Sequence, residues 1–479
     1  MGKEGAGLME GVVQHGKAGK LLPRGVGMQF RGGLEEEVTA HAGVVLLIET
    51  GRRSGVIGTA DRVLAAKKNP KGLGLAQMVE SFVILSALGE ECVEDLQALR
   101  NDLGLAAMLG YQLPAPSTAR SFLDRFHDEK AMAERPAQGS FIPRESPGLE
   151  GLKELVRAST RAYVSAVQPS RDLTMDVDAH LVESSKREAR VTYEGYRGYQ
   201  SLVVTWAETK LVLADQFRDG NVPPGQGIAR LVDEAYDSLP SHPEGWKVAV
   251  RSDSAAYEVK VLDHWNDRGW KFAVSADMSQ QLRAEIGKLA PQEWQFWEEE
   301  GGVVREWAEV PYVPSREGEK KDRQPYRYLA IRIRSPQGVL FSDGNRVKTF
   351  AVVSNDWETE GKALLEWQRG KAGTVEHTHH ILKDELGAGV YPSGKFGADA
   401  AWLRIQVLTA NLLVLMKATA LDEEYRKARP KRLRFAIFNH VGRVVHHARE
   451  VFMRLHRWLL KKIVRPGLRR LQTAAWPTG

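Results

Sequence analysis

The sequence predicts a multidomain α/β protein: a mixed sheet with an all-β insertion, a helical N-terminal domain before it and a basic helical C-terminal tail after it. Before residue 126, apolar residues recur at three- and four-residue intervals, which indicates helices. Between residues 172 and 277, five short segments rich in apolar and β-branched residues alternate with turns and two helical stretches, which is typical of a mixed sheet. Residues 291–353 are rich in aromatic and β-branched residues without helical periodicity, which predicts strands alone.

Length and composition narrow the class of protein. A chain of 479 residues is too long for one ordinary core, so we expect several domains. The composition, 43% hydrophobic and 27% charged, is typical of globular proteins, and no apolar run approaches the roughly 20 residues that cross a bilayer. We therefore expect no membrane partner and no secretory signal. The single cysteine, Cys92, excludes an internal disulfide and a thiolate metal cluster, and it favours a reducing compartment.

Domain boundaries follow from changes in pattern along the chain. Residues 127–148 are polar and punctuated by proline, which predicts a linker between a helical domain and a sheet domain. The expected segments are an irregular stretch with one strand at residues 42–50 (1–70), a helical domain (71–148), the first part of the sheet domain (149–290), the β-rich insertion (291–353), the rest of the sheet domain (354–421) and the basic helical tail (422–479).

Two basic regions are candidates for a polyanionic partner. Arg120 and Arg125 lie on a helix that Pro116 begins, which fits a helix-turn-helix or an ordinary capped helix with solvated arginines. The formal charge is +6, and basic residues gather between residues 426 and 470 among apolar residues at roughly helical spacing. Such a cationic amphipathic helix suits DNA, a membrane surface or another subunit, and composition does not choose among them.

Three acidic residues lie on or directly after predicted strands, where open α/β sheets carry functional residues. Asp176 and Asp178 are two residues apart in the strand DLTMDVDAH, so both side chains leave one face of it. Carboxylates on an apolar strand need a partner or a cation, unless the strand end is exposed. Asp253 follows the apolar strand WKVAV, at the carboxyl end where ligands bind in α/β sheets, although it also suits the N-cap of the next helix.

A fourth acid, Glu376, lies on a predicted helix, TVEHTHHILKDEL. Glu376 and Lys383 are seven residues apart, two helical turns, so they share a face with His380 between them. Carboxylates converging from separate elements suit Mg²⁺ or Mn²⁺ and phosphoryl transfer, with a lysine to hold a phosphate. The histidines also suggest zinc, with Glu376 and His380 or His377 and His380 on one face, but the His-Glu-x-x-His order of common zinc hydrolases is absent.

The chain resembles the DDE transposases of bacterial insertion sequences in the order of its elements. One aspartate lies on a strand and a second aspartate follows another strand. A β-rich insertion comes next, and then a helix that carries a glutamate with a lysine seven residues after it. The motifs are TMDVDAH, RDGN, RSDSAAY and EHTHHILKDEL, and the resemblance covers roughly residues 173–416. It implies a ribonuclease-H-like sheet and a triad of Asp178, Asp253 and Glu376 that binds Mg²⁺ or Mn²⁺. It also implies that Lys383 contacts a phosphate.

The resemblance does not decide whether Asp176 or Asp178 is the first acid of the triad. The family's strand acid is followed by a small residue and a hydroxyl residue, and Asp178 fits this frame except that His180 replaces the hydroxyl, so Asp176 stays a competitor. Related enzymes carry a tyrosine and an arginine before the glutamate. This chain instead has Trp367, Arg369 and Lys371 in a different register, and Arg369 and Lys371 are candidate DNA contacts.

The function implied by the resemblance is that of a transposase, which binds transposon ends, cleaves them and joins their 3′ ends to target DNA. The implied partners are double-stranded DNA, as ends and as target, and a second copy in the DNA complex; the implied compartment is the cytoplasm, at the nucleoid. A stand-alone nuclease and a transposase-derived DNA-binding repressor are the alternatives. In similar enzymes the insertion holds a base swung out of the duplex, which makes Trp294, Trp297 and above all Trp307 candidates for stacking, against the alternative of a local core.

Overall fold

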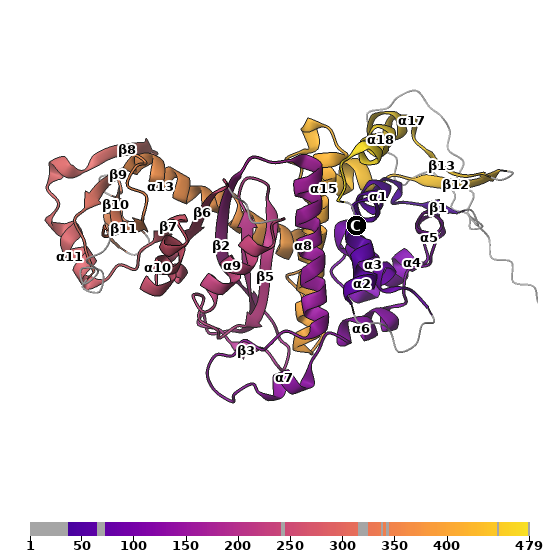
Figure 1. Cartoon of the computed structure of the whole chain (residues 1–479), viewed down its shortest axis with the longest axis horizontal. Coiled ribbons are helices and arrows are strands. Elements are labelled where there is room, and N and C mark those ends of the chain that lie inside the picture. The colour runs from indigo at the N-terminus through magenta and orange to yellow at the C-terminus, as the bar shows by residue number, and fades with distance from the viewer. Residues whose placement is uncertain are drawn as a thin grey trace, which may run out of the picture.

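The computed structural model describes residues 37–64, 72–240, 245–314, 324–336, 339–341, 344–447 and 450–477. It has the predicted mixed α/β architecture, with one large sheet and many helices. In Figure 1 the sheet occupies the left and centre, a long helix stands beside it, and the N-terminal helices lie with the C-terminal segment on the right. The parts of the predicted N-terminal segment at residues 1–36 and 65–70 lie outside the described residues.

Ten strands form the large sheet, in the order β3-β4-β2-β6-β7-β11-β10-β9-β8, with β5 paired to β4. Their bounds are β2 Asp172–Glu183, β3 Arg190–Val191, β4 Arg197–Trp206, β5 Leu211–Asp219, β6 Lys247–Ser252, β7 Lys271–Ser275, β8 Gln295–Glu300, β9 Val303–Val310, β10 Arg327–Arg334 and β11 Val347–Ser354.

The first half of the sheet follows the predicted order of elements. Strands β2, β4 and β5 pair antiparallel, β6 pairs parallel to β2, and β7 pairs parallel to β6. The helices α9 (Ile228–Asp237) and α10 (Val259–Asp267) make the two crossovers. Because β2 and β6 are parallel neighbours, their carboxyl ends meet at one edge of the sheet. We call this the catalytic edge, and it carries the predicted acids.

The predicted β-rich insertion forms four antiparallel strands, β8 to β11, preceded by α11 (Gln280–Lys288). Strand β11 also pairs with β7, so the insertion continues the large sheet. In that register Val352 faces Ser275, the last residue of β7. The first residues of β11 and the strands paired with them therefore extend past the catalytic edge.

Two long helices bury the other flank of the sheet. Helix α8 (Pro147–Val167) and helix α15 (Phe396–Thr419) pack on each other and on β5. By length and composition α15 is the one described helix that could cross a membrane, but nearly all of it is buried inside the protein, as in the core helix of a folded domain. The helices before the linker include α3 Leu75–Leu88, α4 Leu96–Arg100, α5 Leu103–Leu109 and α6 Pro116–Asp124, and α7 Glu129–Ala133 lies within the linker.

The strand predicted at residues 42–50 is wrong. The chain there forms a helical turn and then α1 (Val45–Arg53), followed by α2 (Val56–Val63). The run AGVVLLIE is buried almost throughout, between α15 and the C-terminal helix. A fully buried helix and a buried strand show the same short apolar run, so periodicity does not separate them.

The prediction of an entirely helical tail is also wrong. After α16 (Pro430–Leu433) and a π-helical turn, the chain forms a hairpin of β12 (Gly442–His447) and β13 (Glu450–Leu455), and only then α17 (Arg457–Leu459) and α18 (Arg465–Thr473). The short strand β1 (Val38–Thr39) pairs with β12. Valines and phenylalanine in RVVHH and EVFMRL favour strands, and this outweighed the helical spacing of the charges.

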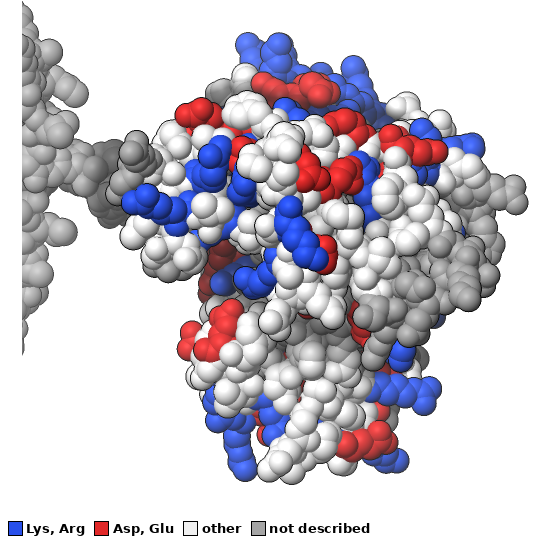
Figure 2. Space-filling model, turned by 90° about the vertical axis from the view of Figure 1, so that its left-hand side faces the viewer, with Lys and Arg blue, Asp and Glu red and all other residues white. Residues whose placement is uncertain are grey.

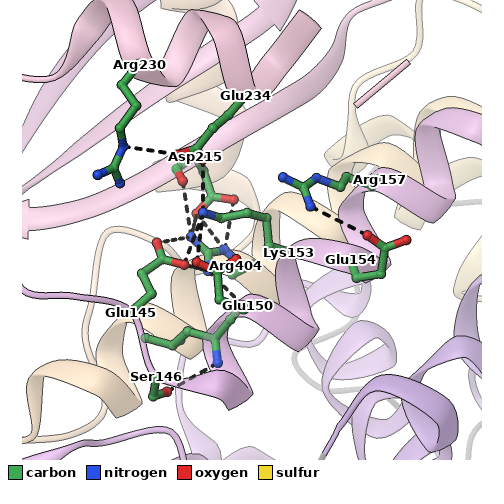
Figure 3. Close-up of polar contacts among 11 residues, drawn as sticks. Glu145, Ser146, Glu150, Lys153, Glu154, Arg157, Asp215, Arg230, Glu234 and Arg404 are labelled. Carbon is green, nitrogen blue, oxygen red and sulfur yellow. Dashed lines mark hydrogen bonds and ion pairs between the residues drawn. The ribbon is translucent and has the colours of Figure 1, made fainter. Parts of the chain in front are cut away.

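A buried ion cluster joins the linker, the long helices and the sheet (Figure 3). Arg404 of α15 is 2% exposed, and its guanidinium donates to both oxygens of Asp215 in β5 and, at 2.9 Å, to Glu145 in the linker. Lys153 of α8 completes the cluster with Glu145 at 3.3 Å and with Glu234 of α9 at 3.0 Å. Buried charges need such partners, because an unpaired one carries a large desolvation cost.

Candidate active site

Three of the predicted acids gather at the catalytic edge. Asp178 projects from β2, Asp253 follows β6, and Glu376 lies in the first turn of α14 (Val375–His380). Burial raises the pKa of Asp178 to about 6; Lys371 opposes this shift, and the negative charges of Asp253 and Glu376 add to it. The electrostatic influence of both acids on Asp178 follows from their closeness.

Lys371 bridges two of these acids. Its Nζ lies 3.6 Å from Oδ1 of Asp178 and 3.6 Å from Oε1 of Glu376, and its side chain is 11% exposed. The carboxylate of Asp253 accepts a hydrogen bond from the backbone N–H of Ala255, so it also caps the following 3-10 turn. The sequence predicted a longer helix directly after Asp253, whereas α10 begins only at Val259.

Asp176, the competing first acid, has a different environment. It is fully buried, and its two oxygens accept hydrogen bonds from Arg251 at 2.6 and 2.8 Å and a third from the hydroxyl of Thr374. Asp176 and Arg251 are also direct partners in the pairing of β2 with β6. Asp176 is therefore fully engaged with protein groups, whereas Asp178 faces the lysine and the other two acids.

Arg251 also anchors the segment that leads to Glu376. It donates to the backbone carbonyl of Trp367, and its guanidinium lies 5.1 Å from the centre of that ring. A Cβ at Gly370 would lie 2.7 Å from Nη1 of Arg251, which explains the glycine there. Sequence analysis missed Arg251, although an arginine in the strand WKVAVRS needs a buried anion, and Asp176 was available.

The π-helical turn from Ile381 to Glu385 changes the expected position of Lys383. A π turn holds more residues than an α turn, so seven residues no longer return the chain to the face of Glu376. Lys383 is exposed, and within the described part of the chain no hydrogen bond or ion pair joins it to Glu376. Its predicted phosphate contact stays a prediction.

The zinc alternative gains no support from the histidines it used. His380 Nδ1 lies 2.5 Å from Asp384, and the ring centre of His380 lies 6.3 Å from that of His377. Among the described residues, no group of three His, Cys, Asp or Glu side chains is close enough to hold a metal ion as it stands. The histidine that sequence analysis missed is His379, which is buried against Asp178.

The insertion brings basic and aromatic side chains past the catalytic edge. Arg369, at the end of α13 (Gly361–Arg369), is 3.1 Å from Glu298 and 4.9 Å from the ring centre of Trp297. On the face turned to the viewer in Figure 2, lysines and arginines are interspersed with acids, so the face does not form one continuous basic field.

The structure favours the local-core alternative for Trp307 over a contact with DNA. Trp307 and Trp297 are each 4% exposed and form a small core with Leu364 and Leu365 of α13. A Cβ at Gly361 would lie 2.2 Å from the Trp307 ring, so α13 packs directly on it. Neither indole ring has an exposed face on which a DNA base could stack, which agrees with the local-core alternative. Trp294 is half-buried, with Arg332 4.0 Å from its ring centre.

The arginines of the predicted helix-turn-helix lie on and after α6. Arg120 is exposed and paired with Glu94, and Arg125 lines a groove of about 410 Å³ with Leu64 and Phe122. Neither arrangement decides between a DNA contact and an ordinary helix surface, and both roles stay predictions.

Comparisons with known proteins identify the family. A family model described as transposase DDE domain group 1 matches residues 20–476. A cryo-EM structure of a piggyBac transposase synaptic complex with hairpin DNA is similar at 10% sequence identity, with a TM-score of 0.43, over 81% of this chain and 78% of that chain. No curated protein matches. Because the family model spans nearly the whole sequence, the chain belongs to the DDE transposases, as a member of group 1.

Proposed function

We propose that this transposase cleaves transposon-end DNA and joins the 3′ ends to target DNA by metal-dependent phosphoryl transfer, with Asp178, Asp253 and Glu376 as its triad. The observation that carries the proposal is the meeting of these acids at one edge, around the buried ammonium of Lys371. We assign Asp178 and not Asp176 to the triad because both oxygens of Asp176 already accept hydrogen bonds from Arg251 and Thr374.

The site fits a divalent cation. Its donors are carboxylate oxygens, which Mg²⁺ and Mn²⁺ prefer, and a cationic group already lies between two of them. Asp178 is mostly buried, Asp253 follows the same edge, and Glu376 is half-exposed and open to DNA. When bound, such ions lower the pKa of a water and stabilise charge on the phosphate oxygens.

The protein groups then have distinct tasks in the reaction. The three carboxylates would hold the ions and so orient the scissile phosphate, and Lys371, once displaced from Asp178, would supply a positive charge for a phosphate oxygen. In cleavage a water oxygen forms the new P–O bond as the 3′ oxygen leaves. In joining, the freed 3′ hydroxyl oxygen forms a P–O bond to a target phosphate as the target strand's own 3′ oxygen leaves. In both steps the attacking group loses a proton and the leaving oxygen gains one. Neither step needs a covalent enzyme intermediate.

One assay separates this function from its alternatives. The full chain is incubated with labelled DNA that carries the terminal repeats flanking its gene, plasmid target and Mg²⁺ or Mn²⁺. A transposase yields label covalently joined to the plasmid, whereas a stand-alone nuclease yields cut ends alone. A DNA-binding repressor shifts the DNA without cutting it. Absence of joined products at every metal concentration would contradict the proposal.

Replacing Lys371 should raise the affinity for the metal, because the ammonium group of this lysine competes with the metal for the carboxylates. We expect Lys371→Gln to bind Mn²⁺ about tenfold more tightly, since no ion pair has to be broken first, a difference of about 1.4 kcal/mol. The metal-free variant should melt at a lower temperature, because its carboxylates repel one another. Mn²⁺ titration and thermal melts measure both, with Lys362→Gln on α13 as the control. Weaker Mn²⁺ binding would show that the lysine supports the metal site.

The β12–β13 hairpin, which we call the arm, is the tail's candidate for contact with DNA. In Figure 1 it projects from the body at the right. Arg443 and Arg454 stand directly opposite each other in its pairing, so two positive charges are held together on the arm. Val451 and Phe452 are exposed beside them. We therefore place the tail's phosphate contacts on the arm.

Replacing both Arg443 and Arg454 with Ala should weaken sequence-independent DNA binding and flatten its salt dependence. Removing one arginine that neutralises a phosphate should reduce the slope of log K against log salt by about 0.9. The matched control is Arg157→Ala with Arg161→Ala, which removes the same charge from α8, where both arginines pair with Glu154. Equal slopes for the two double variants would mean that the arm contacts protein instead.

A further inference from the structure

Two histidines lie against Asp178 without a task in the chemistry above. His379 follows Glu376 by three residues in α14 and is 5% exposed. His180 follows Asp178 by two residues in β2, so the two side chains leave the same face of the strand. The two imidazole ring centres are 5.2 Å apart.

Both rings have a buried nitrogen without a hydrogen-bond partner in the described part of the chain, Nε2 in each case. Leaving such a group unsatisfied costs about 1–3 kcal/mol, so a partner is expected in the working state. For His379, Oδ2 of Asp178 lies 3.6 Å from Nε2, just outside hydrogen-bonding distance.

The two oxygens of Asp178 therefore face different groups. Oδ1 lies 3.6 Å from Nζ of Lys371, on the side of Glu376, and Oδ2 lies on the side of His379. The imidazole of His379 carries at least one N–H in either protonation state, so it can act as a hydrogen-bond donor. Carboxylates that hold metal ions are commonly fixed by a hydrogen bond to the oxygen that faces away from the metal.

The geometry points to His379 as a positioning residue: its Nε2–H donates to Oδ2 of Asp178 and thereby turns Oδ1 toward Glu376 and the metal. A movement of a few tenths of an ångström brings the two atoms within hydrogen-bonding distance. The contact with the His180 ring limits rotation of the His379 ring. This inference rests on the proposed function, because it requires Asp178 to hold the metal.

Two substitutions of His379 distinguish the effect of its hydrogen-bonding nitrogen from the effect of its ring volume. His379→Gln keeps an N–H at about the reach of Nε2, and His379→Phe keeps the ring volume without a nitrogen. We expect His379→Phe to weaken Mn²⁺ binding by the full chain roughly 10–100-fold, as losses of such supporting hydrogen bonds do. Its metal-free melting temperature should be unchanged or higher, since a buried unsatisfied nitrogen is removed. His379→Gln should bind Mn²⁺ nearly as well as the unsubstituted chain.

The neighbouring His380 is the matched control, because it is more exposed and pairs with Asp384. His380→Phe should leave the Mn²⁺ affinity unchanged. Equal affinity in His379→Phe would overturn the inference. A ¹⁴N coupling to bound Mn²⁺ in pulsed EPR that His379→Gln removes would overturn it as well, since the ring would then be a ligand. If His379→Phe does not fold, the Mn²⁺ affinity of His379→Gln tests the inference instead. A tenfold loss of affinity in that variant would count against the inference.

Failure of the proposed function gives a different result. If Asp253→Asn and Glu376→Gln both bind Mn²⁺ as tightly as the unsubstituted chain, the carboxylate site itself is misassigned. If these two variants lose Mn²⁺ binding while His379→Phe keeps it, only the role of His379 is wrong.

Discussion

Glu376→Gln and Asp253→Asn should each lower the rate of transposon-end cleavage about a thousandfold or more. Each substitution removes a charged ligand, and metal stabilisation of the reacting phosphate is worth several kcal/mol, at about 1.4 kcal/mol per tenfold in rate. Binding to end DNA should stay nearly intact, because the acids hold metal and do not read bases. Cleavage time courses beside end-binding titrations measure the two effects separately.

A neighbouring acid provides the control for this experiment. Glu258 lies five residues after Asp253, is exposed and makes no side-chain capping hydrogen bond. Glu258→Gln removes the same charge from the same loop and should cleave at the unsubstituted rate. A normal cleavage rate in either triad variant would show that the assigned acid does not hold the metal.

Asp176→Asn should lower the free energy of unfolding by about 3–5 kcal/mol. The substitution leaves the guanidinium of Arg251, 5% exposed, without its anion, and breaking one partner of a buried ion pair typically costs that much. It should also loosen the segment from Trp367 to Glu376, which Arg251 and Thr374 hold against β2. Chemical denaturation measures the loss directly.

Asp178→Asn should behave in the opposite way, losing cleavage but not stability. Because the folded-state pKa of Asp178 is raised to about 6 from 3.8, its ionisation destabilises the metal-free fold progressively as the pH rises from about 4 to about 6. The neutral amide removes this cost, so the gain should reach up to about 3 kcal/mol above pH 6 and vanish near pH 4. A pH series of denaturation curves shows it. If Asp178→Asn were the less stable of the two variants, the roles of the two acids would be exchanged.

The sequence predicted the parts of this protein that depend on local pattern. The sheet strands, the crossover after β5, the β-rich insertion and the positions of Asp253 and Glu376 follow from alternation, turns and strand ends. From the sequence alone Asp176 and Asp178 are equivalent, because both side chains project from the same face of β2. Only the register with β6, which places Arg251 opposite Asp176, distinguishes them.

The errors share a physical cause, which is tertiary contact outweighing local pattern. Residues 42–50 form a helix because α15 and the C-terminal helix surround them. Trp307 belongs to a core because α13, more than 50 residues later, packs on it. The π turn at residues 381–385 was not predicted either, since no residue type in EHTHHILKDEL announces it.

The ion cluster around Arg404 bears on how the molecule unfolds. It fastens the linker that follows the N-terminal helices to β5 and α8, while α15 itself packs on α3 and α6 from the N-terminal side. The N-terminal helices and the sheet therefore share one helix and one set of buried charges. Such a molecule lacks the independent cooperative units typical of domains joined by a loose tether. Calorimetry of the full chain should show a single transition for both regions.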